Sequence, residues 1–163
     1  PISEKIRDVL LSLECKGMSD ECEALMYAAS RIEHVKSVIL PALKDGKIVL
    51  CDRFLDSSIA YQAYGRELGE DFIRLINQKA SELVTPDCTL QFDIDREAAK
   101  ARMAQGAPLD RLEIEKEDFF ARVAQGYERV AEKEPGRIHR IDSGRSIDEV
   151  YADVLAVVRP MVL

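Results

Sequence analysis

The first third of the chain repeats apolar residues at the spacing of a helix. The pattern between Ile2 and Leu13 predicts one helix, and Ser19 is placed to cap the start of a second. The apolar face of this second helix is formed by Leu25, Met26, Ala29, Ile32 and Val35. We expect Pro41 to kink or end it, because proline removes a backbone hydrogen bond.

Beyond this point, short apolar runs alternate with further helical patterns. The runs predict three buried parallel strands, at 47–51, 88–92 and 137–141. The helical patterns cover 55–64, 70–84, 96–105, about 115–132 and a last helix that starts at a capping box over 146–149. Val150, Val154, Val157 and Val158 form the expected core face of that last helix. This order predicts an α/β fold with a doubly wound parallel sheet.

Length and composition narrow the class of protein. A chain of 163 residues with 47% hydrophobic residues predicts a single packed domain. Its net charge of −7 argues against a nucleic-acid binder, while a few converging arginines could still form a site for a small anion. The sequence contains no apolar run long enough for a membrane span, so we expect no membrane partner.

The four cysteines do not form a C-x-x-C pair, and His34 and His139 stand at no metal-ligand spacing from them. A disulfide framework or zinc site is therefore not expected. We interpret the four as reduced thiols of a cytoplasmic protein.

The strongest local feature is the segment that begins Cys51-Asp52-Arg53. Ligands of open α/β sheets bind beyond the carboxyl ends of strands, and these residues follow a predicted strand. Arg53 suits a phosphate, and Asp52 suits a magnesium shell or the orientation of an arginine. The alternative is a surface turn that closes the strand. The helix that follows carries Ser57, Ser58, Tyr61 and Gln62, and this combination favours a nucleoside monophosphate site.

Taken together, the motifs resemble the thymidylate kinase family, bacterial type. The similar segments are 27–34, 40–43, 46, 49–62, 65–69, 86–87, 110–113, 119–120 and 126–127. They occur in the family's order over nearly the whole chain. The resemblance implies a P-loop nucleoside monophosphate kinase fold and transfer of the γ-phosphoryl group of ATP to dTMP in dTTP biosynthesis, with Mg²⁺ as cofactor.

The resemblance also implies which side chains recognise the thymidine part. Tyr27 stands where a Phe usually stacks on thymine, and Arg31 matches the arginine that reaches a base carbonyl. Ser58 and Gln62 match positions that bond the pyrimidine edge. Tyr61 matches the aromatic residue that disfavours a 2′-hydroxyl.

On the phosphate side, Arg53 matches the arginine on the dTMP phosphate and Arg7 a second one. Asp52 matches the acidic partner near magnesium, and Ser57 belongs to the same substrate-binding segment. The donor side is a lid at about 102–114, which supplies a catalytic arginine in the bacterial type. Arg111 is the first candidate and Arg102 the second, and Arg145, with the loop 143–145, stands where related kinases cradle adenine.

A G-x-x-x-x-G-K-[ST] phosphate loop is expected in this family and does not occur in the chain, which starts at Pro1 and not at Met. We expect that the chain is an N-terminally truncated part of a kinase and that the kinase is a homodimer. Two alternatives remain open. One is a deoxynucleoside kinase, and the other is a non-catalytic nucleotide-binding or dimerisation module.

Overall fold

The computed structural model describes residues 1–103 and 110–162. The chain divides into two compact units. Unit 1 comprises Pro1–Thr85 and Leu109–Val130, and unit 2 comprises Pro86–Pro108 and Ala131–Leu163. The single domain predicted from the length stays a prediction.

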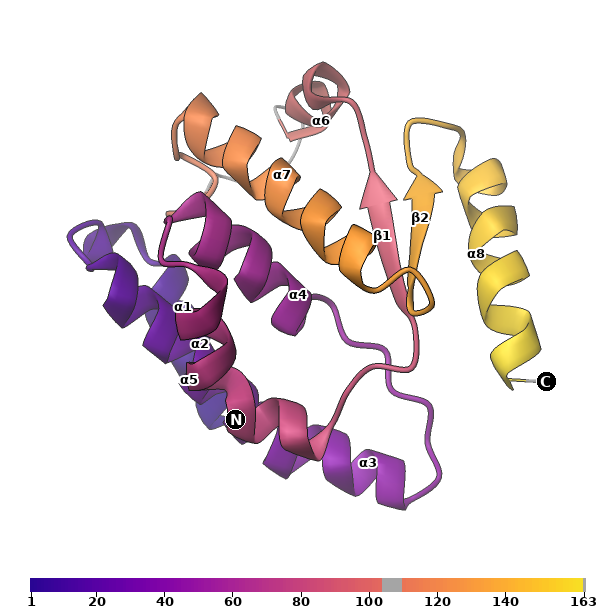
Figure 1. The fold of residues 1–163 in the computed structure, drawn as a ribbon, viewed down its shortest axis with the longest axis horizontal. Helices are drawn as coiled ribbons and strands as arrows, with labels where there is room; N and C mark the ends of the chain where they lie inside the picture. Colours follow the sequence, from indigo (N-terminus) through magenta and orange to yellow (C-terminus); the bar gives the residue numbers. More distant parts are fainter. Residues whose placement is uncertain (104–109, 163) are drawn as a thin grey trace. The chain divides into compact units, whose positions relative to one another are not determined.

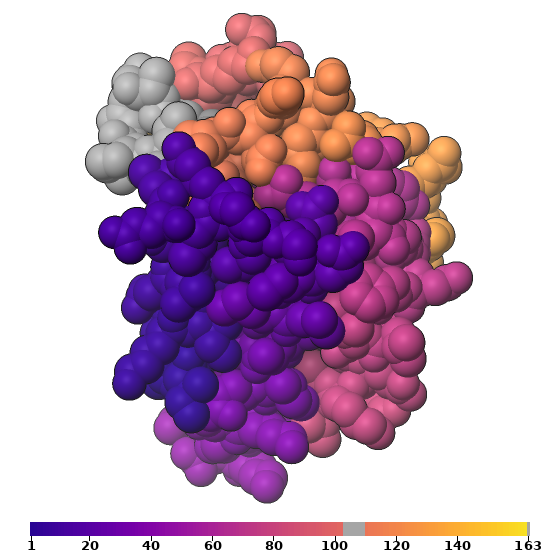
Figure 2. Space-filling view, turned by 90° about the vertical axis from the view of Figure 1, so that its left-hand side faces the viewer, coloured from indigo at the N-terminus to yellow at the C-terminus, as the bar shows by residue number. Residues whose placement is uncertain are grey.

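Unit 1 is helical. Its helices are α1 (Ile2–Leu11), α2 (Asp20–His34), α3 (Leu40–Lys44), α4 (Leu55–Ser58), α5 (Glu70–Leu83) and most of α7 (Glu117–Lys133). A short 3₁₀ turn, η1 (Leu13–Cys15), follows α1. Helix α2 lies between α1 and α5 and packs on both (Figure 1). Figure 2 shows the face that is made largely by the N-terminal helices, in indigo.

Local signals place the ends of α2 as expected. The Ser19 side chain accepts a hydrogen bond from the Cys22 N–H, which confirms the predicted N-cap. At the other end, α2 runs into a π-helical turn, η2 (Val35–Ile39), where the Leu40 N–H bonds the Val35 carbonyl. This turn precedes Pro41, which has no N–H to donate, and so the predicted irregularity takes the form of a π turn.

A second π-helical turn, η3 (Ile59–Gly65), continues α4 and carries the predicted site residues Tyr61 and Gln62. Helix α7 crosses η3 very closely. A Cβ atom at Gly126 would lie 2.8 Å from the Ala60 Cα, and one at Gly65 would lie 2.7 Å from the Phe119 ring. Two glycines are therefore required at this crossing, which brings the start of α4 within reach of α7.

Unit 2 contains two parallel strands, β1 (Thr89–Asp93) and β2 (Ile138–Asp142), with Thr89 opposite Ile138. Helix α6 (Arg96–Met103) follows β1, and α8 (Ile147–Val162) follows β2 and packs beside it (Figure 1). The capping box at the start of α8 is confirmed, since the Ser146 N–H donates to the Glu149 carboxylate. The four valines of its expected core face are partly buried.

The fold prediction is thus confirmed at a coarser level, as a mixed α/β protein that is mostly helical with two parallel strands. The strand predicted at 47–51 was wrong, because this segment has no strand structure. Ile48 and Leu50 are 70% and 90% exposed, and no described strand pairs with the segment. A strand needs a neighbour for its backbone N–H and C=O groups, which local apolar character does not supply.

Among the described helices, none has the length and apolar character needed to span a bilayer.

Candidate functional site

Arg31 and Ser58, both predicted to contact the base, lie together in unit 1. Arg31 Nη2 donates to the Ser58 hydroxyl at 2.7 Å and to the Phe54 carbonyl at 3.1 Å. Its Nη1 donates to Asn77 Oδ1 on α5. The guanidinium also lies over the Phe54 ring, 5.6 Å from the ring centre. Two segments of the chain, 54–58 and α5, therefore hold this side chain in one orientation.

Every hydrogen-bond partner of Arg31 is neutral. Burial lowers the pKa of Arg31 to about 10, which still leaves the guanidinium charged at neutral pH. An arginine has five N–H donors, and the three bonds above leave two for a ligand. The Ser58 oxygen accepts from Arg31, so the hydroxyl hydrogen can be donated elsewhere. The pair offers hydrogen-bond donors and a positive charge.

Gln62 points inward, to a buried carboxylate that the sequence reading missed. Gln62 Nε2 donates to Glu23 Oε1 at 2.9 Å, and both side chains are buried. Arg66 and Arg111 donate to the same carboxylate, at 3.0 and 2.7 Å from Glu23 Oε2. Burial by itself raises the pKa of Glu23, but the bonds from Arg66, Gln62 and Arg111 outweigh it, and the pKa lies below its ordinary value.

Arg111 is placed by a local turn. Asp110 Oδ1 accepts from the backbone N–H groups of Leu112 and Glu113, and the Asp110 N–H donates to the Glu113 carboxylate. The Asp-Arg-x-Glu segment thus forms hydrogen bonds like those of a capping box. Arg111 stands between the two acidic residues in sequence, and its side chain turns inward. Its Nε donates to the Leu10 carbonyl at 2.7 Å, and only 5% of Arg111 is exposed. Its predicted contact with transferring phosphates stays a prediction, because the side chain is buried and turned inward, bonded to Leu10 and Glu23.

Arg53 has a strained backbone and an exposed position. Its φ is +66°, a left-handed conformation that is costly for a residue with a Cβ atom. Its guanidinium lies 5.2 Å from the centre of the Tyr61 ring. Asp52, beside it, is also exposed. Strain of this kind is often found in binding sites, so the geometry agrees with the phosphate-binding role predicted for Arg53.

Aromatic residues surround this arginine. The Tyr61 ring makes edge contacts with Phe119 and Tyr127 on α7, at centre distances of 6.0 and 6.2 Å. The Tyr127 hydroxyl lies 2.8 Å from the Ser57 hydroxyl. Burial raises the pKa of Tyr127, so it stays protonated. Tyr127 therefore contacts both Ser57 and Tyr61 and holds the two residues on one surface beside Arg53.

Arg7 and Tyr27 lie on α1 and α2, and Arg7 is exposed. Burial, with the negative charge of Glu23 adding to it, raises the pKa of Tyr27 to about 12, and Arg7 is close enough to oppose this shift. Tyr27 therefore keeps its hydroxyl proton. The structure thus places both residues in unit 1 with the other predicted acceptor-side residues.

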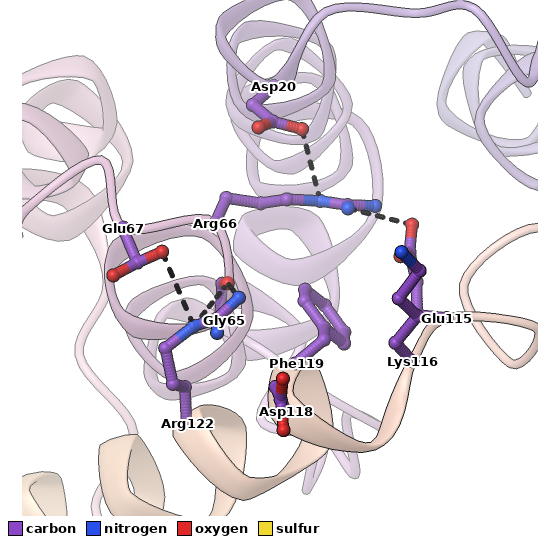
Figure 3. A pocket seen from close by; sticks show the side chains of 9 residues that line it. All are labelled: Asp20, Gly65, Arg66, Glu67, Glu115, Lys116, Asp118, Phe119 and Arg122. Carbon is purple, nitrogen blue, oxygen red and sulfur yellow. Dashed lines mark hydrogen bonds and ion pairs between the residues drawn. The ribbon is translucent and has the colours of Figure 1, made fainter.

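A cavity of about 250 Å³ lies on another part of unit 1 (Figure 3). It is lined by Asp20, Gly65, Arg66, Glu67, Glu115, Lys116, Asp118, Phe119 and Arg122. Arg66 bonds Asp20 and Glu115 at 3.3 and 2.7 Å, and Arg122 donates to the Gly65 carbonyl. None of the predicted substrate residues lines this cavity, so we do not assign the substrate to it.

Of the predicted donor-side residues, Arg111 lies in unit 1, and Arg102 and Arg145 lie in unit 2. Ser143 follows β2 and is tied to the end of β1, because its N–H and hydroxyl both donate to the Asp93 carbonyl at 2.8 Å. Arg102 on α6 donates to the Ser143 carbonyl at 2.9 Å. Arg145 pairs with Asp142 and Asp153. Arg102 and Arg145 therefore meet at one loop beyond the strands, while positions 104–109 of the predicted lid lie outside the described residues.

The sequence reading missed three residues that contact the predicted substrate and lid residues: Glu23, Asn77 and Tyr127. Asn77 interrupts the apolar stripe of α5, which could have revealed it. Glu23 lies in the first turn of α2, where an acid is ordinarily solvated.

In the described part of the chain no group of three or more His, Cys, Asp or Glu residues could hold a metal ion. The four cysteines are free thiols.

Comparison with known proteins identifies close relatives. A family model described as thymidylate kinase matches residues 1–154. The thymidylate kinase of Clostridium novyi is 42% identical over 155 residues, which is 94% of this chain and 76% of that protein. That of Pelotomaculum thermopropionicum is 45% identical over 155 residues, 94% of this chain and 72% of the relative. That of Halalkalibacterium halodurans is 42% identical over 161 residues, 98% and 77% of the two chains.

Proposed function

This chain belongs to the thymidylate kinase family, and from that premise we propose that it transfers the γ-phosphoryl group of ATP to dTMP, giving dTDP for nucleotide biosynthesis. The observation that carries the acceptor side of this proposal is the Arg31 cluster. A charged guanidinium with neutral partners and two remaining N–H donors suits the carbonyl groups of a pyrimidine. Cytosine presents an amino donor at one of these positions and is a poorer partner.

The phosphate of dTMP would be held by Arg53 and Arg7, which are both exposed. Tyr61, held against Phe119 and Tyr127, would pack on the sugar. Tyr27 would stack on the base with its hydroxyl protonated. A fixed set of cations at the acceptor phosphate reduces the Coulomb repulsion between two polyanionic substrates.

Mg²⁺ belongs to the proposal as a cofactor. Magnesium is usually bound by one or two carboxylates together with substrate phosphates and water, and a single exposed carboxylate at Asp52 fits that mode. When bound, the ion would neutralise charge on the donor phosphates. The residues of the chain supply the rest, which is positioning of the acceptor and stabilisation of charge.

On the donor side, the proposed contact with adenine is the loop 143–145 beyond the strands of unit 2. This loop contains Arg145 and accepts a hydrogen bond from Arg102. Arg111 remains a candidate for charge stabilisation at the transferring group. Because Arg111 is buried and bonded to Leu10 and Glu23, its side chain would have to move outward to reach that group. A cytoplasmic location and a homodimer built on the apolar helices complete the proposal. Exposed apolar residues on α1 and α2, such as Val9 and Leu25, are available for such a contact.

The activity can be tested with a coupled assay for ADP. With ATP and Mg²⁺, we expect ADP formation with dTMP and little with dCMP or thymidine. Arg53→Ala should raise the KM for dTMP strongly, because it removes a phosphate contact. Arg74→Ala is the matched control, since Arg74 is an exposed arginine on α5 that pairs with Glu70. ADP formation with thymidine and not with dTMP would show that the acceptor is a nucleoside and refute the proposal.

A further inference from the structure

Asn77 is a buried polar residue on the apolar face of α5. It lies between Ile73 and Ala80 on that face, and only 2% of it is exposed. Burying an amide is costly unless both of its ends are bonded. Asn77 meets this condition, because its Nδ2 donates to the Ile73 carbonyl at 2.8 Å and its Oδ1 accepts from Arg31.

The bond to Ile73 decides which end of the amide meets Arg31. A backbone carbonyl only accepts, so the Asn77 nitrogen must point toward Ile73. The Asn77 oxygen is thereby directed at Arg31, which only donates. The orientation of this amide is fixed by hydrogen-bond chemistry on both sides.

Asn77 in turn fixes the guanidinium. The Phe54 carbonyl and Ser58 hold Arg31 through Nη2 alone. Asn77 holds it through Nη1, so the planar group is attached at both ends and cannot turn about a single nitrogen. The two remaining N–H groups, one on Nη1 and one on Nε, then point in set directions.

The partner is also neutral, which distinguishes Arg31 from its neighbours. Arg66 and Arg111 share the Glu23 carboxylate, whereas Arg31 bonds an amide, a hydroxyl and a carbonyl. An asparagine orients the guanidinium without cancelling its charge. Asp56 is near enough to favour the charged form of Arg31, but the three hydrogen bonds themselves bring no negative charge to the guanidinium.

We propose that Asn77 is a positioning residue for base selection, which holds Arg31 so that one of its remaining donors meets a pyrimidine carbonyl and disfavours an amino group. This inference rests on the proposed function, in which dTMP is the acceptor. Asn77 itself does not touch the base. Its effect is the fixed direction of the Arg31 donors.

The test is calorimetric binding of dTMP and dCMP to this chain and to Asn77→Leu, which keeps the volume and removes the amide. We expect the dTMP affinity to fall about tenfold or more, as for loss of one well-oriented charged hydrogen bond. The dCMP affinity should change much less, so that the ratio of the two falls. Gln78→Leu is the matched control, because Gln78 is exposed on the same helix and its side chain bonds Glu82, another exposed residue of α5. It should leave both affinities unchanged.

A double variant separates positioning from general packing. In an Arg31→Ala background, Asn77→Leu should cause no further loss of dTMP affinity, because the group that it orients is gone. Thermal unfolding is measured for each variant, and Asn77→Ser, which leaves room for a water, replaces Asn77→Leu if that variant does not fold.

The outcomes are distinct. If the unaltered chain binds no dTMP, the proposed function fails for this chain. If it binds dTMP and Asn77→Leu or Asn77→Ser keeps the dTMP-to-dCMP ratio, the inference about Asn77 is overturned and the proposed function stands. An additive loss in the Arg31→Ala background also overturns the inference.

Discussion

Replacement of Glu23 by Gln tests the largest buried charge cluster of unit 1. Glu23 is fully buried and accepts hydrogen bonds from Gln62, Arg66 and Arg111. Glutamine keeps the shape and removes the charge. The variant leaves Arg111, of which 5% is exposed, without a carboxylate partner, whereas Arg66 keeps Asp20 and Glu115.

The expected loss follows from this difference. Removal of one member of a buried ion pair costs about 3–5 kcal/mol, because the remaining charge is buried without compensation. The free energy of unfolding of a protein domain is about 5–15 kcal/mol, so the expected loss is a large fraction of the total. For a chain of 163 residues, each kcal/mol lowers Tm by about 2–4 °C, and we expect a decrease of roughly 10 °C.

Urea unfolding followed by circular dichroism measures the change at pH 7. Glu115→Gln is the matched control, because it removes a carboxylate from the same Arg66 at a side chain that is 28% exposed. Its expected effect is about 0–1 kcal/mol. Equal effects of the two variants would refute the argument that burial, and not the number of ion pairs, sets the magnitude.

The pH dependence has a definite sign. The pKa of Glu23 is lowered below 4.5 in the folded protein, so its stabilisation is complete above pH 4.5 and is lost as the pH falls through the folded value. The difference in unfolding free energy between the unaltered protein and Glu23→Gln should therefore narrow in acid. A constant difference down to pH 2 would contradict the ionised state of Glu23.

Two further predictions concern the backbone. Arg53→Gly should raise the unfolding free energy by about 1 kcal/mol, because glycine adopts the φ of +66° without strain. The same variant should weaken dTMP binding in calorimetry. A decrease in the unfolding free energy would contradict the argument that the backbone of Arg53 is strained. Gly126→Ala should cost about 1–3 kcal/mol, because its Cβ would lie 2.8 Å from the Ala60 Cα, whereas Gly136→Ala, with nothing within 4 Å, should change the unfolding free energy little. Equal effects of these two alanine variants in urea unfolding would show that the close crossing of α7 and η3 is not required.

Local patterns in the sequence were enough to predict the helices and the family. A period of 3.6 residues and side-chain caps are local signals, so α1, α2, α5 and the start of α8 lie where the pattern predicts them. The order of the motifs along the chain was sufficient to identify the thymidylate kinase family. Strands β1 and β2 were also found, because their apolar runs pair with each other.

The contacts between distant side chains became visible in the folded protein alone. Arg31 and Asn77 are 46 positions apart, and Glu23 and Arg111 are 88 positions apart, so no local pattern links them. The same reason explains the error at 47–51, where the structure describes no strand beside an apolar run. Helical structure is set by neighbours in the chain, but strand pairing and buried polar contacts depend on neighbours in space. The sequence therefore predicted a binding role for Arg31, and the fold shows which residues hold its side chain.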